Sequence, residues 1–484
     1  MKLKHLIDGL EYKEVIGTID KEINNLQHDS REVDQHDIFV AISGHDSDGH
    51  DYIESAVSFG ADVVVSEKSP DLRYDNVTFI VVENSRVALA KLATNYYKNP
   101  SQNLKMIGVT GTNGKTSVTF LIKNLLKKQG QKSAIIGTTG IYIDDEKVES
   151  TLTTPDSVTI NKILRQVADK GIEYVIMEVS SHALDQNRAA YLDFDIALFT
   201  NITHDHLDYH QTFEAYSEAK KLLFDNLKSD GIAIVNVDDA GYKDMISDTE
   251  ASVSLVGWDV NANYQIKNDK ISNDGSQFDI EHNDKSVTVH SPLIAQFNIM
   301  NLSLSLVAVS KILQEELLVT ATGLSTITTA PGRMERVNLS NGAIAIVDYA
   351  HTPDALEKAA KVSKLMSDKT KGKLIVVFGC GGNRDKSKRP KMAEAAEKYA
   401  DRIIVTDDNP RTENREKIYA DIEKGLTKAG NYVVIGDRKE AIVEAVKISN
   451  SGDIILIAGK GHENYQIIDK EKIHFDDKEV VLGV

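Results

Sequence analysis

The chain has 484 residues, and this length predicts roughly two to four packed domains. Its net charge of −17 argues against a general nucleic-acid-binding surface, although a locally basic pocket could still hold a small anion. The single cysteine, Cys380, excludes an intramolecular disulfide. Neither a signal peptide nor a run of ~20 apolar residues is found, so we expect a cytoplasmic protein without membrane insertion.

Residues 1 to about 100 form a first block of short strands and helices. Apolar runs predict strands at 37–42, 61–67 and 77–83, and we expect a helix near 84–97. The polar stretch "YYKNPSQN" then interrupts the pattern and is typical of a linker. We therefore predict a first domain over residues 1–99.

Two further blocks alternate apolar strands with helical stretches, and the segment "TAPGRMER" separates them. Nearly continuous apolar strands between helices predict parallel sheets covered on both faces, so we expect an α/β fold with domains at 100–331 and 332–484. The strands of these two domains are expected at 105–111, 133–140, 174–181, 196–202, 231–238, 343–350, 373–382, 402–409, 432–437 and 453–461.

The stretch "MIGVTGTNGKTSVTF" has the strand, glycine turn and helix of a phosphate-binding loop. The usual pattern, G-x-x-x-x-G-K-[ST], requires a glycine where this chain has Val109. Backbone N–H groups and the helix N-terminus would still bind phosphate. Lys115 would reach the β- and γ-phosphates, and Thr116 would hold Mg²⁺.

Candidate metal ligands follow the loop. Glu178 ends a predicted strand, where a carboxylate is well placed for a metal bound to phosphates. His204, His206 and His210 could suggest zinc, but no cysteine lies nearby and their spacing matches no trusted zinc pattern. Oxygen ligands and a nucleotide favour Mg²⁺, to which one imidazole could add.

These motifs together resemble the Mur ligases, the ATP-dependent amide-forming enzymes of peptidoglycan precursor synthesis. The family's loop is G-x-x-G-x-x-G-K-[TS], which the chain matches and which accounts for Val109. The third-block motifs are most similar to members that add the third peptide residue to UDP-N-acetylmuramoyl-L-alanyl-D-glutamate. The resemblance covers essentially the whole chain, in the order "GVTGTNGKTS", "TTP", "MEVSSHALDQNR", "NITHDHLDYH", "EAKKLLF", "FNIMN", "PGRMER", "VDYAHTPD", "GCGGNRDKSKRP", "DDNPR" and "GKGHENYQ".

The resemblance implies a UDP-binding N-terminal domain, a central P-loop ATP-binding domain and a C-terminal Rossmann-like domain that binds the amino acid. It implies Mg²⁺ ligation by Thr116, Glu178, His206 and a carbamylated Lys220, and catalytic roles for the last three with Lys115 and Arg333. The ATP-binding residues that it implies are Gly111, Thr112, Asn113, Gly114, Lys115, Thr116, Ser117, Asn301, Arg333 and Asp348.

The resemblance also implies which residues bind the UDP-N-acetylmuramoyl-dipeptide. The residues that it implies are Ser30, His45, Asp46, Ser47, Thr153, Thr154, Ser180, Gln186 and Arg188. One departure concerns the glycine that the family has before "FN", because Ala295 stands there. If that position needs a positive φ, alanine would be strained and the placement of adenine would be affected.

The incoming amino acid is predicted from three strand ends of the third block together with the family's diaminopimelate-type motif, which "DDNPR" resembles. The candidates are meso-diaminopimelate, whose distal end carries an amino group and a carboxylate, and L-lysine, which has only an ammonium there. Arg411 offers a planar fork for a carboxylate, and an unpaired buried arginine would penalise lysine. We predict meso-diaminopimelate, bound by Arg384, Asp408, Asn409, Pro410, Arg411, Gly459 and Glu463.

The expected chemistry activates the D-glutamate carboxylate as an acyl phosphate, which the incoming amine attacks. Lys115, Arg333 and Mg²⁺ would stabilise the anionic stages, and no protein nucleophile is needed. We expect a monomer whose partners are these small molecules and which binds no nucleic acid.

Three other functions compete with that of a Mur ligase. A P-loop kinase or switch protein would release a phosphorylated product without an amide. A folylpolyglutamate synthetase would lack the roughly 100 residues that precede the phosphate loop here. A catalytically dead nucleotide-binding module is disfavoured by the intact Lys115, Glu178, His206 and Lys220.

Overall fold

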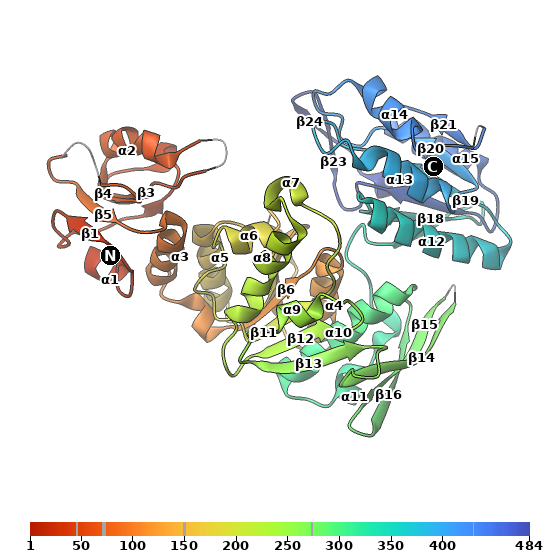
Figure 1. The fold of residues 1–484 in the computed structure, drawn as a ribbon. Helices are drawn as coiled ribbons and strands as arrows, with labels where there is room; N and C mark the ends of the chain where they lie inside the picture. The colour runs from red at the N-terminus through yellow and green to blue at the C-terminus, as the bar shows by residue number, and fades with distance from the viewer. Residues whose placement is uncertain (45–46, 70–73, 149–151, 273, 429) are drawn as a thin grey trace. The chain divides into compact units, whose positions relative to one another are not determined.

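A computed structural model of the chain describes residues 1–44, 47–69, 74–148, 152–272, 274–428 and 430–484. The chain, whose ribbon is drawn in Figure 1, divides into two compact units. The first unit comprises residues 1–115, 125–256 and 307–316, and the second comprises residues 116–124, 257–306 and 317–484.

The N-terminal sheet of the first unit has the strand order β1-β5-β4-β3-β2, and only the β1/β5 pair is antiparallel. The strands and the helix expected between residues 37 and 97 are confirmed. The elements are α1 (Leu3–Leu6), β1 (Glu14–Ile16), β2 (Leu26–Gln27), η1 (Ser30–Glu32), β3 (Asp37–Val40), η2 (Gly49–Tyr52), α2 (Ile53–Phe59), β4 (Ala61–Ser66), β5 (Thr78–Val81) and α3 (Ser85–Tyr96).

The first unit also holds the strand order β13-β12-β11-β6-β10-β7-β8-β9, in which β13 to β7 are parallel and β8 and β9 are antiparallel. Strand β6 lies between β11 and β10, which sets the loop after it at the middle of the carboxyl edge, where α/β sheets bind ligands. The elements of this region are η3 (Pro100–Asn103), β6 (Lys105–Thr110), α4 (Lys115–Lys128), β7 (Ser133–Gly137), β8 (Gly140–Ile143), β9 (Glu146–Val148), α5 (Ser157–Asp169), β10 (Tyr174–Glu178), α6 (Ser181–Asp185), β11 (Ile196–Phe199), α7 (Leu207–His210), α8 (Phe213–Asp225), β12 (Ile232–Asn236), α9 (Tyr242–Met245) and β13 (Ser252–Gly257).

An antiparallel meander in the second unit adds to the parallel pattern that the sequence predicted. It pairs β14 (Tyr264–Ser272), β15 (Gly275–His282) and β16 (Lys285–Ser291). Buried and exposed side chains alternate along β16, as in a half-buried strand. The elements that follow are α10 (Gln296–Leu313), α11 (Leu317–Thr320) and η4 (Leu324–Thr326).

Helix α10 is the one helix of the described residues that is long and apolar enough to cross a membrane. However, 72% of this helix is buried inside the protein, as is typical of a core helix.

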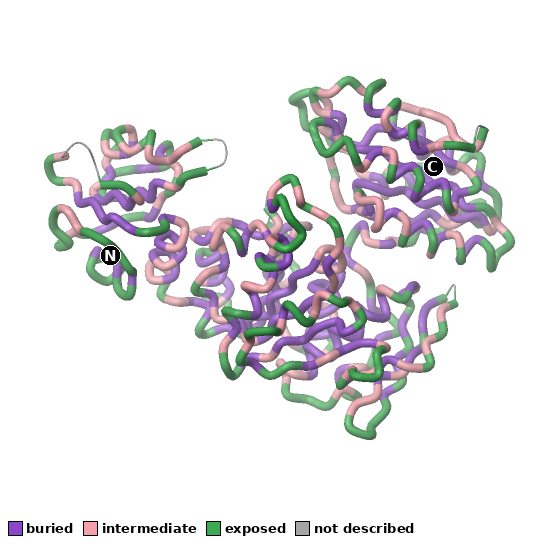
Figure 2. The backbone as a smooth tube through the Cα atoms, viewed as in Figure 1, coloured by how far each residue is buried: buried purple, intermediate pink, exposed green. Residues whose placement is uncertain are grey.

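The C-terminal sheet has the order β17-β18-β22-β19-β20-β21 and is parallel except for β17. Helices α12 to α14 pack on one face and α15 and α16 on the other, so the predicted doubly wound domain is confirmed. Figure 2 shows its strands as a buried layer between these helices. The elements are β17 (Glu335–Asn338), β18 (Ile344–Asp348), α12 (Pro353–Thr370), β19 (Leu374–Phe378), α13 (Lys388–Glu397), β20 (Arg402–Val405), α14 (Arg415–Glu423), β21 (Tyr432–Val434), α15 (Arg438–Ile448), β22 (Ile454–Ala458), β23 (Tyr465–Ile468), β24 (Glu471–His474) and α16 (Asp477–Leu482).

Candidate active site

The phosphate loop depends on two glycines. Gly111 has φ +142°, and a Cβ there would lie 2.0 Å from the hydroxyl oxygen of Thr200. Gly114 has φ +92°, in the region that favours glycine, and it directly precedes α4. Val109, by contrast, is fully buried inside β6. The position where the usual pattern has a glycine is therefore part of the strand in this chain.

Lys115 is the first residue of α4 and folds back over the loop. Its Nζ donates to the carbonyl oxygens of Gly111 at 2.7 Å and Thr112 at 3.0 Å. Gly114 provides no side-chain cap for α4. A lysine held over the turn and an uncapped helix start are the arrangement expected for binding phosphate.

Lys220 lies against the same loop from α8 and is only 1% exposed. Its Nζ donates to the carbonyl oxygen of Gly111 at 3.1 Å and sits 4.4 Å from the centre of the Tyr216 ring. Burial, followed by repulsion from Lys115, lowers the pKa of Lys220 well below its usual value. Lys221 instead pairs with Asp225 and Asp248, both at 2.6 Å.

Glu178 ends β10 and is completely buried. One carboxylate oxygen accepts the backbone N–H of Thr138 at 2.9 Å, and the other accepts the Thr138 hydroxyl at 3.0 Å. Because a buried carboxylate needs such donors, Thr138 fixes its orientation. The sequence reasoning did not single out Thr138.

His206 lies in a group of aromatic rings next to the loop. Its ring centre is 4.9 Å from that of His182. Burial lowers the pKa of His206, an effect that the Asp205 carboxylate opposes and that the charges of Lys115 and Lys220 reinforce. The net shift favours the neutral imidazole, which is the form that ligates a metal.

No three His, Cys, Asp or Glu side chains of the described residues are grouped so as to hold a metal ion by themselves. The Glu178 carboxylate and the His206 imidazole are ligand types that fit Mg²⁺, which commonly takes only one or two protein ligands and shares the rest with phosphates and water.

The second unit carries the other candidate ATP residues, and Ser117 lies with Thr116 in the first turn of α4. Arg333 donates to the Thr116 hydroxyl at 3.2 Å, and its guanidinium lies 4.6 Å from the centre of the Tyr349 ring. The Nε of Arg333 is buried and has no hydrogen-bond partner among the described residues. This guanidinium therefore has a donor left for an anion.

Asp348 ends β18, and its two oxygens accept the backbone N–H groups of Met334 at 2.7 Å and Ala350 at 2.9 Å. Burial raises its pKa, an effect that Arg333 opposes. Asn301 is buried in α10. Just before that helix, Ala295 has φ +91°, so this position has the positive φ on which the expected strain depends.

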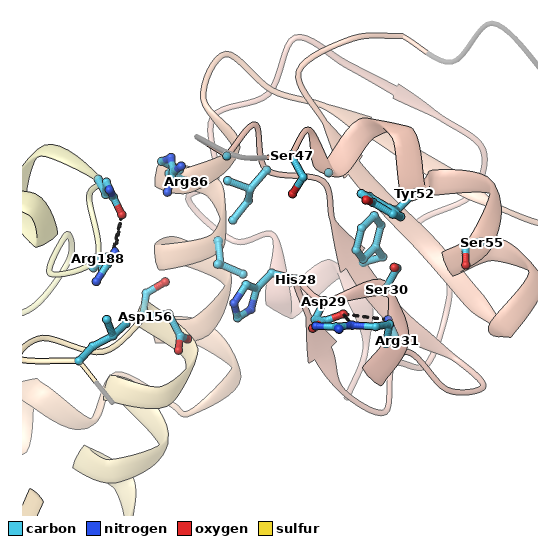
Figure 3. A pocket seen from close by; sticks show the side chains of 18 of the residues that line it. His28, Asp29, Ser30, Arg31, Ser47, Tyr52, Ser55, Arg86, Asp156 and Arg188 are labelled. Carbon is cyan, nitrogen blue, oxygen red and sulfur yellow. Dashed lines mark hydrogen bonds and ion pairs between the residues drawn. The ribbon is translucent and has the colours of Figure 1, made fainter. Parts of the chain in front are cut away.

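A pocket of about 820 Å³ lies within the first unit (Figure 3). This volume is within the range of small-molecule sites. The pocket is lined by four of the residues predicted to bind the nucleotide sugar, Ser30, Ser47, Gln186 and Arg188. The predicted ligands His45 and Asp46 lie outside the described residues.

A chain of hydrogen bonds leads from this pocket toward Glu178. The Arg188 guanidinium donates to the carbonyl oxygen of Thr154 at 2.9 Å, and the Thr154 hydroxyl donates to the carbonyl oxygen of Glu178 at 2.8 Å. That hydroxyl also accepts the Ser180 N–H at 3.1 Å, and the Thr153 hydroxyl lies 3.1 Å from that of Thr138. The predicted substrate residues therefore bridge the pocket and the candidate metal ligands.

Three loops at the carboxyl edge of the C-terminal sheet meet because β22, β19 and β20 are neighbours. The Asn409 amide donates to the Glu463 carboxylate at 3.0 Å, and Arg411 donates to the carbonyl oxygen of Gly382 at 3.0 Å. A Cβ at Gly459 would lie 2.8 Å from an Asp408 carboxylate oxygen, so that glycine allows a close approach.

Pro410 is buried between Asn409 and Arg411, whereas Arg384 is exposed on the loop after β19. The described contacts join Asn409 to Glu463 and tie Arg411 to the loop of Gly382, but they do not include the Arg384 side chain.

Lys460 was missed by the sequence reasoning, although it lies within the motif "GKGHENYQ". It is 0% exposed, and its Nζ donates to the Asn409 side-chain oxygen at 3.1 Å and to Glu463 at 2.9 Å. Asn409 also accepts the backbone N–H of Ile467 at 2.9 Å. The amide of Asn409 and one oxygen of Glu463 are thus fixed by a buried cation.

Arg389 was also missed by the sequence reasoning, and it supports the loops that follow β19 and β20. Its fully buried guanidinium donates to Glu413 at 2.8 and 2.9 Å and to Asp421 at 3.0 Å. Glu413 in turn accepts the N–H of Asn383 at 2.7 Å. The pair therefore connects the loop after β19 with the loop after β20.

Family models match three parts of the chain. The Mur ligase family, catalytic domain, matches residues 22–97, the Mur ligase middle domain matches 109–309, and the Mur ligase glutamate ligase domain matches 332–461. The chain belongs to the Mur ligase family. It is an ATP-dependent ligase with the three-domain architecture of that family, as the motifs predicted.

Two similar full-length relatives are diaminopimelate ligases by name. The chain is 42% identical to UDP-N-acetylmuramoyl-L-alanyl-D-glutamate--2,6-diaminopimelate ligase 1 of Clostridium acetobutylicum, over 99% of this chain and 98% of the relative. It is also 42% identical to the ligase so named from Clostridium tetani, over 100% and 99%.

Two solved structures are also similar to this chain. One of a UDP-N-acetylmuramoyl-L-alanyl-D-glutamate--2,6-diaminopimelate ligase matches with a TM-score of 0.71 and 34% identity, over 100% of this chain and 98% of the other. The folylpolyglutamate synthase of Mycobacterium tuberculosis, complexed with ADP, shares the fold at 18% identity, with a TM-score of 0.65 over 78% of this chain and 92% of the other.

Proposed function

We propose that this Mur ligase joins meso-2,6-diaminopimelate to the D-glutamate of UDP-N-acetylmuramoyl-L-alanyl-D-glutamate, with hydrolysis of ATP to ADP and phosphate. The product is a peptidoglycan precursor. The observation that carries the proposal is the meeting of Arg411, Asn409 and Glu463 on adjacent loops of the C-terminal sheet. The names of the full-length relatives support it.

Each domain takes one substrate in this proposal. Residues 1–99 bind the UDP group, residues 100–331 bind ATP, and residues 332–484 bind the amino acid. The three family matches support these divisions because their gaps fall near both proposed boundaries. Ser30, Ser47, Gln186 and Arg188 contact the nucleotide sugar in the pocket, with His45 and Asp46 on the same substrate.

The reacting carboxylate lies at the far end of that substrate. Thr153, Thr154 and Ser180 hold the dipeptide and direct its D-glutamate carboxylate toward Glu178, along the hydrogen bonds that connect the pocket with that residue. Holding the carboxylate and ATP in one orientation supplies much of the rate enhancement in such a transfer.

ATP is bound by the loop from Gly111 to Ser117, with Asn301 and Asp348 toward the nucleoside. Lys115 and Arg333 hold the γ-phosphoryl group and stabilise the charge that develops as the substrate carboxylate attacks it. Arg333 has a buried donor available for this purpose. When bound, Mg²⁺ neutralises phosphate charge, and Thr116, Glu178, His206 and carbamylated Lys220 would hold it.

The amino acid is recognised by charges of both signs. Arg411 and Arg384 bind its carboxylates, and Glu463 with the Gly459 backbone takes the distal ammonium. Asp408, Asn409 and Pro410 shape the loop. Among the described contacts Lys460 and Asn409 donate to the same oxygen of Glu463, which leaves the other oxygen available for the distal ammonium. The amine then attacks the acyl phosphate, and phosphate leaves.

The proposed location and partners of the protein follow from its proposed substrates. We propose a cytoplasmic monomer that acts on small molecules and neither inserts into a membrane nor binds nucleic acid. The net charge of −17 supports the last point.

Mass spectrometry of the product tests this proposal. With the UDP-linked dipeptide, ATP and meso-diaminopimelate, the product should gain one diaminopimelate residue while one phosphate is released. A phosphorylated peptide as the final product would indicate a kinase. Glutamate added to a folate, with the UDP-linked dipeptide unchanged, would indicate a folylpolyglutamate synthetase.

A further inference from the structure

Two arginines from different parts of the chain line the same pocket. Arg86 lies in the first turn of α3, and Arg188 follows α6. Figure 3 shows both near one end of the pocket, away from Tyr52 and Ser55. Burial lowers the pKa of Arg188, repulsion from Arg86 lowers it further, and the Asp156 carboxylate opposes both effects.

Neither arginine is neutralised by a carboxylate within ion-pair distance among the described residues. Arg188 donates to the side-chain oxygen of Gln186 at 2.6 and 3.0 Å and to the carbonyl of Thr154 at 2.9 Å. Arg86 donates to the carbonyl oxygen of Ser43 at 3.0 Å. All these acceptors are uncharged, so neither guanidinium forms an ion pair with a carboxylate of the described residues, although Asp156 lines the same pocket.

A third arginine of the pocket provides the contrast. Arg31 makes a bidentate ion pair with Asp29, at 2.6 Å for the shortest contact. This pair lowers the pKa of Asp29 to about 2. The charge of Arg31 is therefore already balanced, although its side chain is 85% exposed.

We propose that Arg86, together with Arg188 on the facing wall, binds the diphosphate of the nucleotide sugar. The proposal rests on the proposed function, which places that substrate in this pocket. Two adjacent phosphates accept the planar forks of two arginines and remove their mutual repulsion. A binding role for Arg86 is the new element.

The dipeptide carboxylates are the other anions of that substrate, but they fit Arg86 less well. The carboxylate that reacts must lie near Glu178, to which the pocket connects through Arg188 and Thr154. Arg86 is instead hydrogen-bonded to Ser43, in the N-terminal domain and a few residues before Ser47, which also lines the pocket. Its position therefore corresponds to the nucleotide half of the substrate.

Calorimetric titration of UDP and uridine tests the proposal without turnover. The wild-type protein should bind UDP more tightly than uridine. Arg86→Met should weaken UDP binding about 10- to 100-fold, which is the range for losing a charge-assisted hydrogen bond, and should leave uridine binding unchanged. Arg86→Lys should recover part of the loss. Arg31→Met is the matched control and should change UDP binding less than about threefold.

Three results would overturn the proposal. Unchanged UDP affinity in Arg86→Met would remove the diphosphate contact. Equal losses for UDP and uridine would show that Arg86 only supports the loop through Ser43. A loss with the UDP-linked dipeptide but not with UDP would assign Arg86 to a carboxylate. Wild-type protein that binds neither UDP nor uridine would contradict the proposed function itself.

Discussion

The Nζ of Lys220 lies 3.1 Å from the carbonyl oxygen of Gly111, which buries a lysine against the phosphate loop. Burial and the neighbouring Lys115 lower the pKa of Lys220 well below its usual value. A neutral amine can react with carbon dioxide to give a carbamate, whereas an ammonium has no lone pair for this reaction or for a metal. The surroundings of Lys220 therefore favour the carbamylation that the family resemblance implies.

The adjacent lysines of α8 give the first prediction. Lys220→Ala should lower kcat by about 100-fold or more, because a charge next to the phosphates is lost. Short carboxylic acids such as acetate should restore part of the activity by occupying the vacated space. Lys221→Ala is the control, and its effect should be mild because the ion pairs of Lys221 with described residues are those with Asp225 and Asp248, away from the loop. Equal and mild losses in steady-state assays would contradict a special role for Lys220.

A second prediction concerns the phosphate loop. Lys115→Ala should abolish amide formation while the thermal unfolding midpoint stays close to that of the wild type. Lys127 lies on the same helix but pairs with Asp145 at the surface, where its side chain is 59% exposed. Lys127→Ala should therefore retain nearly full activity. Wild-type turnover by a folded Lys115→Ala protein would refute the assignment of the loop.

Lys460 supplies a third prediction, about the amino-acid site. Lys460→Met removes the cation that fixes Glu463 and Asn409, while the Asn409 amide still donates to Glu463. The KM for diaminopimelate should rise about tenfold, as for the loss of a hydrogen bond to a charged group, and the KM for ATP should change little. Lys447→Met removes an exposed lysine and should change neither constant. An unchanged KM for the amino acid in Lys460→Met would show that Lys460 does not position Glu463.

The Arg389–Glu413 pair supplies a prediction about stability. The hydrogen bond from Arg389 is the largest cause that lowers the pKa of Glu413 from 4.5 to about 2. Because the folded-state pKa is depressed, the pair stabilises the protein above about pH 4.5, and this stabilisation is lost as the pH falls toward 2.

Glu413→Gln should therefore lower the free energy of unfolding by about 3 kcal/mol at pH 7, since it leaves a buried arginine less well compensated. The difference from the wild type should shrink below about pH 4.5 in urea titrations. Glu444→Gln, which removes the partner of the exposed Lys447, is the control and should have little effect. A difference that does not vary with pH would contradict the account.

The sequence predicted the strands and the loops that follow them well, because apolar runs mark buried parallel strands directly. The loops after β22, β19 and β20 could be assigned to one site because parallel strands end at the same edge of a sheet. The positive φ at Ala295 could also be anticipated, since a single expected glycine was missing.

Buried charges were harder to predict. Whether Arg389 or Lys460 is buried depends on partners that are brought close only by the fold, such as Glu413, which is 24 residues from Arg389. The same is true of Thr138, whose contact with Glu178 spans 40 residues. The side chains that support a site therefore require the structure, whereas the residues that would touch the ligands lie in motifs.

The central claim is the choice of amino acid, and the most direct test is phosphate release with meso-diaminopimelate and with L-lysine. We predict that kcat/KM favours diaminopimelate by on the order of 10²–10³, because lysine would leave the charge of Arg411 unpaired. Arg411→Ala should lose most of this preference through a slower reaction with diaminopimelate. Equal kcat/KM values for the two amino acids in the wild-type enzyme, or unchanged diaminopimelate kinetics in Arg411→Ala, would contradict the claim.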